Sequence, residues 1–84
     1  MNTAMKVVRT IEVEVPNLGD RIKKAREKAK ASDGRSLTQL AALAGMTTAN
    51  WYRIESEKFN SLPFETLKRM ESALGTDFGV VING

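Results

Sequence analysis

The sequence predicts a mainly α domain of four to five helices, with a short β-strand at each end of the chain. Four segments between residues 18 and 74 carry apolar residues at helical spacing, and the segments before and after them are rich in valine. The chain has 84 residues, of which 42% are hydrophobic and 27% charged, which is typical of one small folded domain. We therefore expect a single domain over residues 1–84.

Residues 6–15 alternate between apolar and polar positions, as expected of a strand with one buried face, and Pro16 ends the run. One side of this strand is apolar apart from Arg9 and holds Val7, Ile11, Val13 and Val15. Residues 77–83 contain Phe-Gly-Val-Val-Ile and predict a second strand. Because a lone strand leaves its backbone groups unpaired, we expect the two strands to pair antiparallel, within one chain or across a dimer.

Residues 17–76 form the expected helical core. Asn17 is suited to cap a first helix that runs from Leu18 to about Ala31. Two short helices follow, and Pro63 suits the first turn of a further helix that Gly75 stops.

The stretch 36–55 reads as two short helices joined by a tight turn. Ser36 and Thr47 are good N-caps, because their hydroxyls can accept hydrogen bonds from backbone N–H groups. Gly45 lies between them, where a left-handed residue is needed. Two helices that meet at a glycine turn form a helix-turn-helix, and its second helix, here about 47–57, is shaped to enter a DNA major groove.

The charge distribution favours a polyanionic partner. The net charge is +3, but residues 17–60 hold nine Lys or Arg against five Asp or Glu. The alternative is a solvated, lysine-rich helix face, and charge alone does not separate the two.

The composition argues against catalysis. The chain has no cysteine and no histidine, which excludes disulfides and thiolate metal sites and removes the commonest general base. We therefore expect no metal, no cofactor and no enzymatic activity. The N-terminus lacks the unbroken apolar run of a signal peptide or membrane span, so we expect a cytoplasmic protein with no membrane partner.

Several motifs occur in a fixed order along the core: Leu18-Gly19-Asp20-Arg21-Ile22, Arg26, Leu40-Ala41-x-x-Ala44-Gly45-Met46-Thr47, Arg53-Ile54-Glu55, Pro63-x-Glu65-Thr66-Leu67 and Ala73-Leu74-Gly75. Together they resemble the Xre, or phage repressor and Cro, class of helix-turn-helix proteins. The resemblance covers about two-thirds of the chain, which makes it more specific than a glycine turn alone. It implies a repressor-like fold and a small transcriptional regulator that binds double-stranded DNA as a homodimer.

The resemblance also implies which residues contact DNA. It places Thr48, Ala49 and Arg53 at the bases, and a guanidinium can bind O6 and N7 of guanine together. For Arg53 the alternatives are a phosphate contact and a surface ion pair with Glu57. The expected contacts to the DNA backbone come from Ser36, Leu37, Gln39, Thr47, Asn50, Tyr52, Lys58 and Asn60.

The resemblance further implies a structural ion pair between Arg26 and Glu55, buried between two helices. Two positions depart from the family pattern. Leu37 stands where a DNA-contacting glutamine is common, so a contact is missing or Leu37 meets a thymine methyl or the core. Glu57 stands where glycine is common, which alters the exit from the recognition helix.

Other functions share this fold. An antitoxin would bind a toxin protein and repress its own operon, using the terminal strands as a partner-binding edge. Phage Cro-like repressors and restriction-modification controllers are variants of the regulator. A protein-interaction module would keep the fold without binding DNA.

Overall fold

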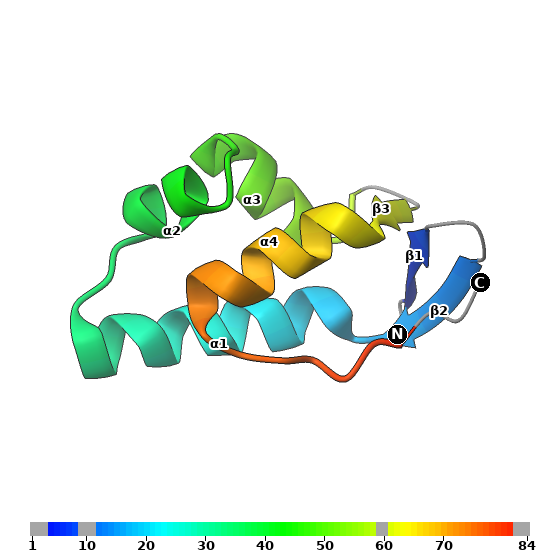
Figure 1. The fold of residues 1–84 in the computed structure, drawn as a ribbon, viewed down its shortest axis with the longest axis horizontal. Helices are drawn as coiled ribbons and strands as arrows, with labels where there is room; N and C mark the ends of the chain where they lie inside the picture. The colour runs from blue at the N-terminus through cyan, green and yellow to red at the C-terminus, as the bar shows by residue number, and fades with distance from the viewer. Residues whose placement is uncertain (1–3, 9–11, 59–60, 82–84) are drawn as a thin grey trace.

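The computed structural model describes residues 4–8, 12–58 and 61–81. These residues form four helices and three short strands (Figure 1). The helices are α1 (Leu18–Asp33), α2 (Leu37–Leu43), α3 (Thr48–Glu55) and α4 (Phe64–Leu74). The strands are β1 (Ala4–Val8), β2 (Glu12–Pro16) and β3 (Ser61–Pro63). The prediction of a mainly α, helix-turn-helix fold is confirmed, with four helices in the described residues.

The strands form one mixed sheet in the order β2-β1-β3. Strand β1 pairs antiparallel with β2, with Val7 opposite Val13, and parallel with β3, with Val7 opposite Leu62. The single strand predicted over 6–15 is therefore wrong, because this segment holds parts of two strands. Alternation cannot distinguish one long strand from a hairpin: in the observed register Met5 lies opposite Val15, and both are buried on the core side.

The strand predicted over 77–83 also differs from the structure. Residues 77–81 lie outside the sheet, whereas Ile82 and Asn83 are outside the described residues. Side chains bind the peptide groups of Phe78: its N–H donates to Glu71 Oε2 at 2.8 Å, and its carbonyl accepts from Arg21 at 2.7 Å. Gly79 follows in the left-handed conformation, with φ +76°. The antiparallel pairing therefore joins β1 and β2, while the C-terminal segment is held by α1 and α4.

The core lies between the four helices and the inner face of the sheet. Trp51 is its largest fully buried side chain. Around it lie other side chains of the same buried cluster, among them Met5, Leu18, Ile22, Leu40, Ile54, Leu67 and Met70. The buried positions of α1 and α3 recur at helical spacing, as the periodicity predicts.

The helix ends follow local sequence in most places. Ser36 and Thr47 accept N-cap hydrogen bonds, and Gly45 and Gly75 adopt left-handed conformations with φ +72° and +67°. The prediction that Asn17 caps α1 with its side chain is wrong. Asn17 is left-handed, with φ 57°, and makes no side-chain cap hydrogen bond. The cap comes instead from a residue far along the chain, as described below.

Candidate nucleic-acid interface

Helices α2 and α3 meet at a turn that closes the end of α2. The N–H of Gly45 donates to Ala42 O at 3.0 Å, and the N–H of Met46 donates to Ala41 O at 2.9 Å. This pair of bonds around a left-handed residue satisfies carbonyls that the helix itself leaves unpaired. Figure 1 shows α2 and α3 together at the top of the view, above α4. The turn thus fixes the orientation of α3 relative to α2.

The outer face of α3 carries the side chains expected to read DNA. Ala49 and Arg53 are exposed, and Thr48 is half-buried. Tyr52 lies on the same side and is 51% exposed. The opposite face of α3 is buried, because Trp51 and Ile54 pack into the core. This packing fixes which side chains of α3 face the solvent.

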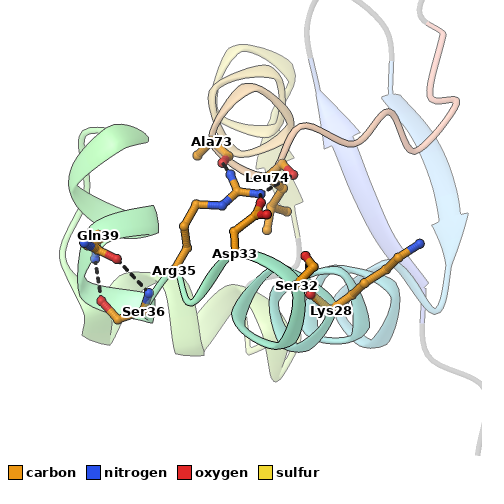
Figure 2. Close-up of polar contacts among 8 residues, drawn as sticks. All are labelled: Lys28, Ser32, Asp33, Arg35, Ser36, Gln39, Ala73 and Leu74. Atoms are coloured by element: carbon orange, nitrogen blue, oxygen red, sulfur yellow. Dashed lines mark hydrogen bonds and ion pairs between the residues drawn. The ribbon is translucent and has the colours of Figure 1, made fainter.

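Several residues expected to contact the DNA backbone lie at the N-termini of α2 and α3, where they make capping hydrogen bonds. Ser36 and Gln39 bind each other: Gln39 N–H donates to Ser36 Oγ at 3.2 Å, and Ser36 N–H donates to Gln39 Oε1 at 2.9 Å (Figure 2). Thr47 accepts from the N–H of Asn50 at 3.1 Å. These side chains therefore cap helices, whether or not they also meet phosphate.

The three other residues expected to contact the DNA backbone are Leu37, Lys58 and Asn60. Leu37 is half-buried and packs against the hydrophobic core, which is one of the alternatives that its departure from the family pattern left open. Lys58 is exposed just beyond α3. Asn60 lies outside the described residues.

A buried ion pair holds the inner side of α3 against α1. Arg26 Nε donates to Glu55 Oε2 at 2.6 Å, and Arg26 Nη2 donates to Glu55 Oε1 at 3.0 Å. The indole N–H of Trp51 donates to the same Oε2 at 2.7 Å. The two charged side chains are only 14% and 5% exposed. The bond to Glu55 raises the pKa of Arg26 above its ordinary value, although burial opposes this.

Glu57 lies just beyond α3 and ends that helix in a left-handed conformation, which is rare for a residue other than glycine. It takes the left-handed conformation, with φ 55°, while its N–H donates to Ile54 O and the N–H of Lys58 donates to Arg53 O. The chain thus leaves α3 through the same kind of turn that Gly45 makes after α2, with glutamate in the glycine position. For this reason α3 ends at Glu55 and not near residue 57.

The side chain of Glu57 turns toward α1 rather than toward Arg53. Its Oε2 accepts from the backbone N–H of Gly19 at 2.9 Å, which caps the N-terminus of α1. Gly19 permits this approach, since a Cβ there would lie 2.2 Å from the carbonyl oxygen of Glu55. Sequence reasoning missed this contact, although the glycine in the second position of a helix was the signal that could have found it.

Several basic side chains of the central region bind other groups of the same chain. Arg21 and Arg35 both donate to backbone carbonyls, of Phe78 and Ala73 respectively, at 2.7 Å. Lys24 forms an exposed ion pair with Asp20. These side chains keep their charge, but part of their hydrogen-bonding capacity is taken up by groups of the same chain.

The described residues contain neither a metal-binding cluster nor a membrane-spanning helix. Within them, no group of three or more acidic, histidine or cysteine side chains is placed to hold a metal ion. None of the four helices is long and apolar enough to cross a membrane.

Comparison with known families gives a match over most of the chain. The model of the helix-turn-helix domain matches residues 17–81, which include all four helices. Searches of curated proteins and of solved structures found no significant match. Helix-turn-helix domains are typically DNA-binding and non-enzymatic, so the match indicates DNA binding and transcription regulation. The chain belongs to the helix-turn-helix domain family.

Proposed function

We propose that this protein is a sequence-specific, double-stranded DNA-binding repressor of the Xre class. Recognition helix α3 lies in the major groove. The observation that carries the proposal is the division of α3 into two faces: Trp51 and Ile54 are buried, while Ala49 and Arg53 are exposed. The buried ion pair of Arg26 and Glu55 holds this orientation from behind.

In this proposal, three side chains of α3 contact bases. Arg53 makes the most discriminating contact, because its guanidinium can bind O6 and N7 of one guanine. Thr48 and Ala49 are short and reach only nearby groups, such as a thymine methyl. The sequence preference therefore depends mainly on Arg53.

Contacts with phosphate fix the position of α3 in the groove but carry little sequence information. The exposed side chains of Asn50, Tyr52 and Lys58 are suited to this role, and Ser36, Gln39 and Thr47 lie at the starts of the two helices. Leu37 is excluded from our set of phosphate contacts, because it packs against the core.

Two copies are required to read a site of useful length, because one short helix covers few base pairs. We propose a homodimer on two half-sites about 10 base pairs apart, the spacing of one helical turn. Analytical ultracentrifugation with and without DNA measures this directly. Two protein copies per duplex support the dimer, and one copy at saturation contradicts it.

The experiment that tests the function is a gel-shift assay on the DNA upstream of the protein's own gene, because small repressors can regulate their own promoters. We expect a discrete complex that survives excess unrelated duplex. Binding that disappears equally with any competitor would contradict sequence specificity.

The position of β2 supports a second candidate function. Strand β2 lies at the edge of the sheet, and among the described residues it pairs with β1 alone. A strand edge can accept a strand from another chain, so an antitoxin could bind its toxin protein there. Co-purification of a small toxin with the protein from its native host would favour this candidate.

A further inference from the structure

The segment between α1 and α2 contains an arginine that is turned into the molecule. Arg35 Nη1 donates to the carbonyl of Ala73 at 2.7 Å, and Nη2 donates to Asp33 Oδ2 at 2.8 Å. A longer contact of 3.5 Å joins Nη2 to the carbonyl of Leu74. Figure 2 shows the guanidinium between the last residues of α4 and the loop that leads into α2. Its Nε is shielded from solvent and has no hydrogen-bond partner, so the two terminal nitrogens make all of its polar contacts.

The end of α4 needs such a partner. The last carbonyls of a helix have no intrahelical donor and form the negative end of the helix dipole, where a cation is favourable. The last turn of α4 contains no basic residue of its own. Arg35 therefore supplies from another part of the chain, 38 positions earlier, the cation that α4 lacks.

The same side chain lies directly before the start of the helix-turn-helix. Ser36 is the N-cap of α2, and its carbonyl accepts the first helical hydrogen bond, from Leu40 N–H at 3.0 Å. Because Arg35 is bonded to α4, the beginning of α2 has a fixed position relative to that helix. Asp33, bonded to the same guanidinium, adds the last residue of α1 to this cluster.

The helix-turn-helix is thus held to the rest of the domain at both ends through an arginine. At its end, Arg26 of α1 binds Glu55. At its beginning, Arg35 binds Ala73 of α4. The resemblance to repressors accounts for the first contact, but nothing in the sequence assigns the second.

We propose that Arg35 is a positioning residue for DNA recognition: its guanidinium fork fixes α2, and through the Gly45 turn α3, on the ends of α1 and α4, without touching DNA. This inference rests on the proposed DNA-binding function. It gives Arg35, one of the nine Lys and Arg residues counted in residues 17–60, a role inside the domain.

The test compares Arg35→Ala with Arg69→Ala, an equal loss of charge at an exposed position of α4 outside the interface. Binding of a duplex chosen by the wild-type protein from a random pool is titrated at several salt concentrations. We expect Arg35→Ala to weaken binding about tenfold, since apparent affinity falls with the fraction of molecules in the competent arrangement. The salt dependence of the affinity of Arg35→Ala should equal that of the wild-type protein. Arg69→Ala should bind like wild type.

A second measurement reports the position of α2 without DNA. Amide hydrogen exchange of Leu40, whose N–H closes the first turn of α2, should become faster in Arg35→Ala and stay unchanged in Arg69→Ala. If Arg35→Ala does not fold, Arg35→Lys is used, because lysine keeps the charge but lacks the planar fork. We expect Arg35→Lys to show smaller changes of the same kind.

Three results would overturn the inference. A fall of about 0.9 in the salt slope of Arg35→Ala would mean that Arg35 contacts a phosphate directly. Wild-type affinity and wild-type exchange of Leu40 in both Arg35 variants would mean that the fork positions nothing. Faster exchange with unchanged affinity would limit Arg35 to a structural role. If the wild-type protein selects no duplex, the proposed function fails, whereas the exchange of Leu40 still tests the fork.

Discussion

The backbone N–H of Gly19 donates a hydrogen bond to Oε2 of Glu57 at 2.9 Å, so the residue at the exit of α3 also caps the start of α1. Glu57 is left-handed, with φ 55°, where the chain turns out of α3. Beside this bond, Arg26 and Glu55 join the same two helices through a buried ion pair. The exit of α3 is therefore bound to α1 at two neighbouring points. One is the bond from the Gly19 backbone N–H to Glu57, and the other is the ion pair of Arg26 and Glu55.

The close approach at Gly19 predicts a large cost for a small substitution. In Gly19→Ala the new Cβ would lie 2.2 Å from the carbonyl oxygen of Glu55 and 2.7 Å from Cγ of Glu57. One of these neighbours is backbone, so α1 or α3 must shift. We expect a loss of stability of about 3 kcal/mol, at the upper end for overpacking, measured by urea denaturation.

Gly79→Ala is the matched control for that experiment. Gly79 is left-handed, with φ +76°, but a Cβ there would meet nothing within 4 Å. The control should cost about 1 kcal/mol, from backbone strain alone. Equal losses in the two variants would show that the α1–α3 approach is not tight.

The ion pair of Arg26 and Glu55 predicts that the effects of substituting these two residues on the free energy of unfolding are not additive. Arg26→Ala or Glu55→Ala leaves one charge buried without its partner, which costs about 3–5 kcal/mol. The double variant should cost clearly less than the sum of the single ones, because it leaves neither charge buried. Glu55→Ala also removes the acceptor of the Trp51 indole N–H, so it should shift Trp51 fluorescence. Unchanged melting curves in both single variants would contradict the structural role of the pair.

Arg53 and Lys58 predict two different effects on DNA binding. Both side chains are exposed, one on α3 and one just beyond it. Arg53→Ala should reduce the preference for the selected duplex over other sequences by about 1–3 kcal/mol, the range for a two-point base contact. Lys58→Ala should weaken all sequences alike and lower the salt slope by about one unit. Competition titrations measure both quantities, and an Arg53→Ala variant that keeps full discrimination would exclude Arg53 from base reading.

Local sequence signals predicted the parts of the fold that depend on local chemistry. The caps at Ser36 and Thr47 and the left-handed Gly45 and Gly75 each follow from residues within one helical turn. The helical periodicity of α3 likewise predicts that Trp51 is buried. These features need no knowledge of where the rest of the chain lies.

The features that were missed depend on contacts between distant parts of the chain. Both the Gly19–Glu57 and the Arg35–Ala73 bonds join residues 38 positions apart, a separation that periodicity does not report. The alternation of residues 6–15 predicted β-structure correctly but could not show that the chain reverses. The buried carboxylate of Glu71 accepts a hydrogen bond from the N–H of Phe78, an N–H that a strand would use for pairing. No pattern in the sequence indicates this contact.

The proposed reading of double-stranded DNA by α3 is best tested by a single titration. Fluorescence anisotropy follows binding of the selected duplex and of a shuffled duplex of equal composition, each at two salt concentrations. We expect tighter binding of the selected duplex at both salt concentrations, and a steep fall of affinity for either duplex as salt rises. Equal binding of the two duplexes, or no binding of either at the lower salt concentration, would contradict DNA reading by α3.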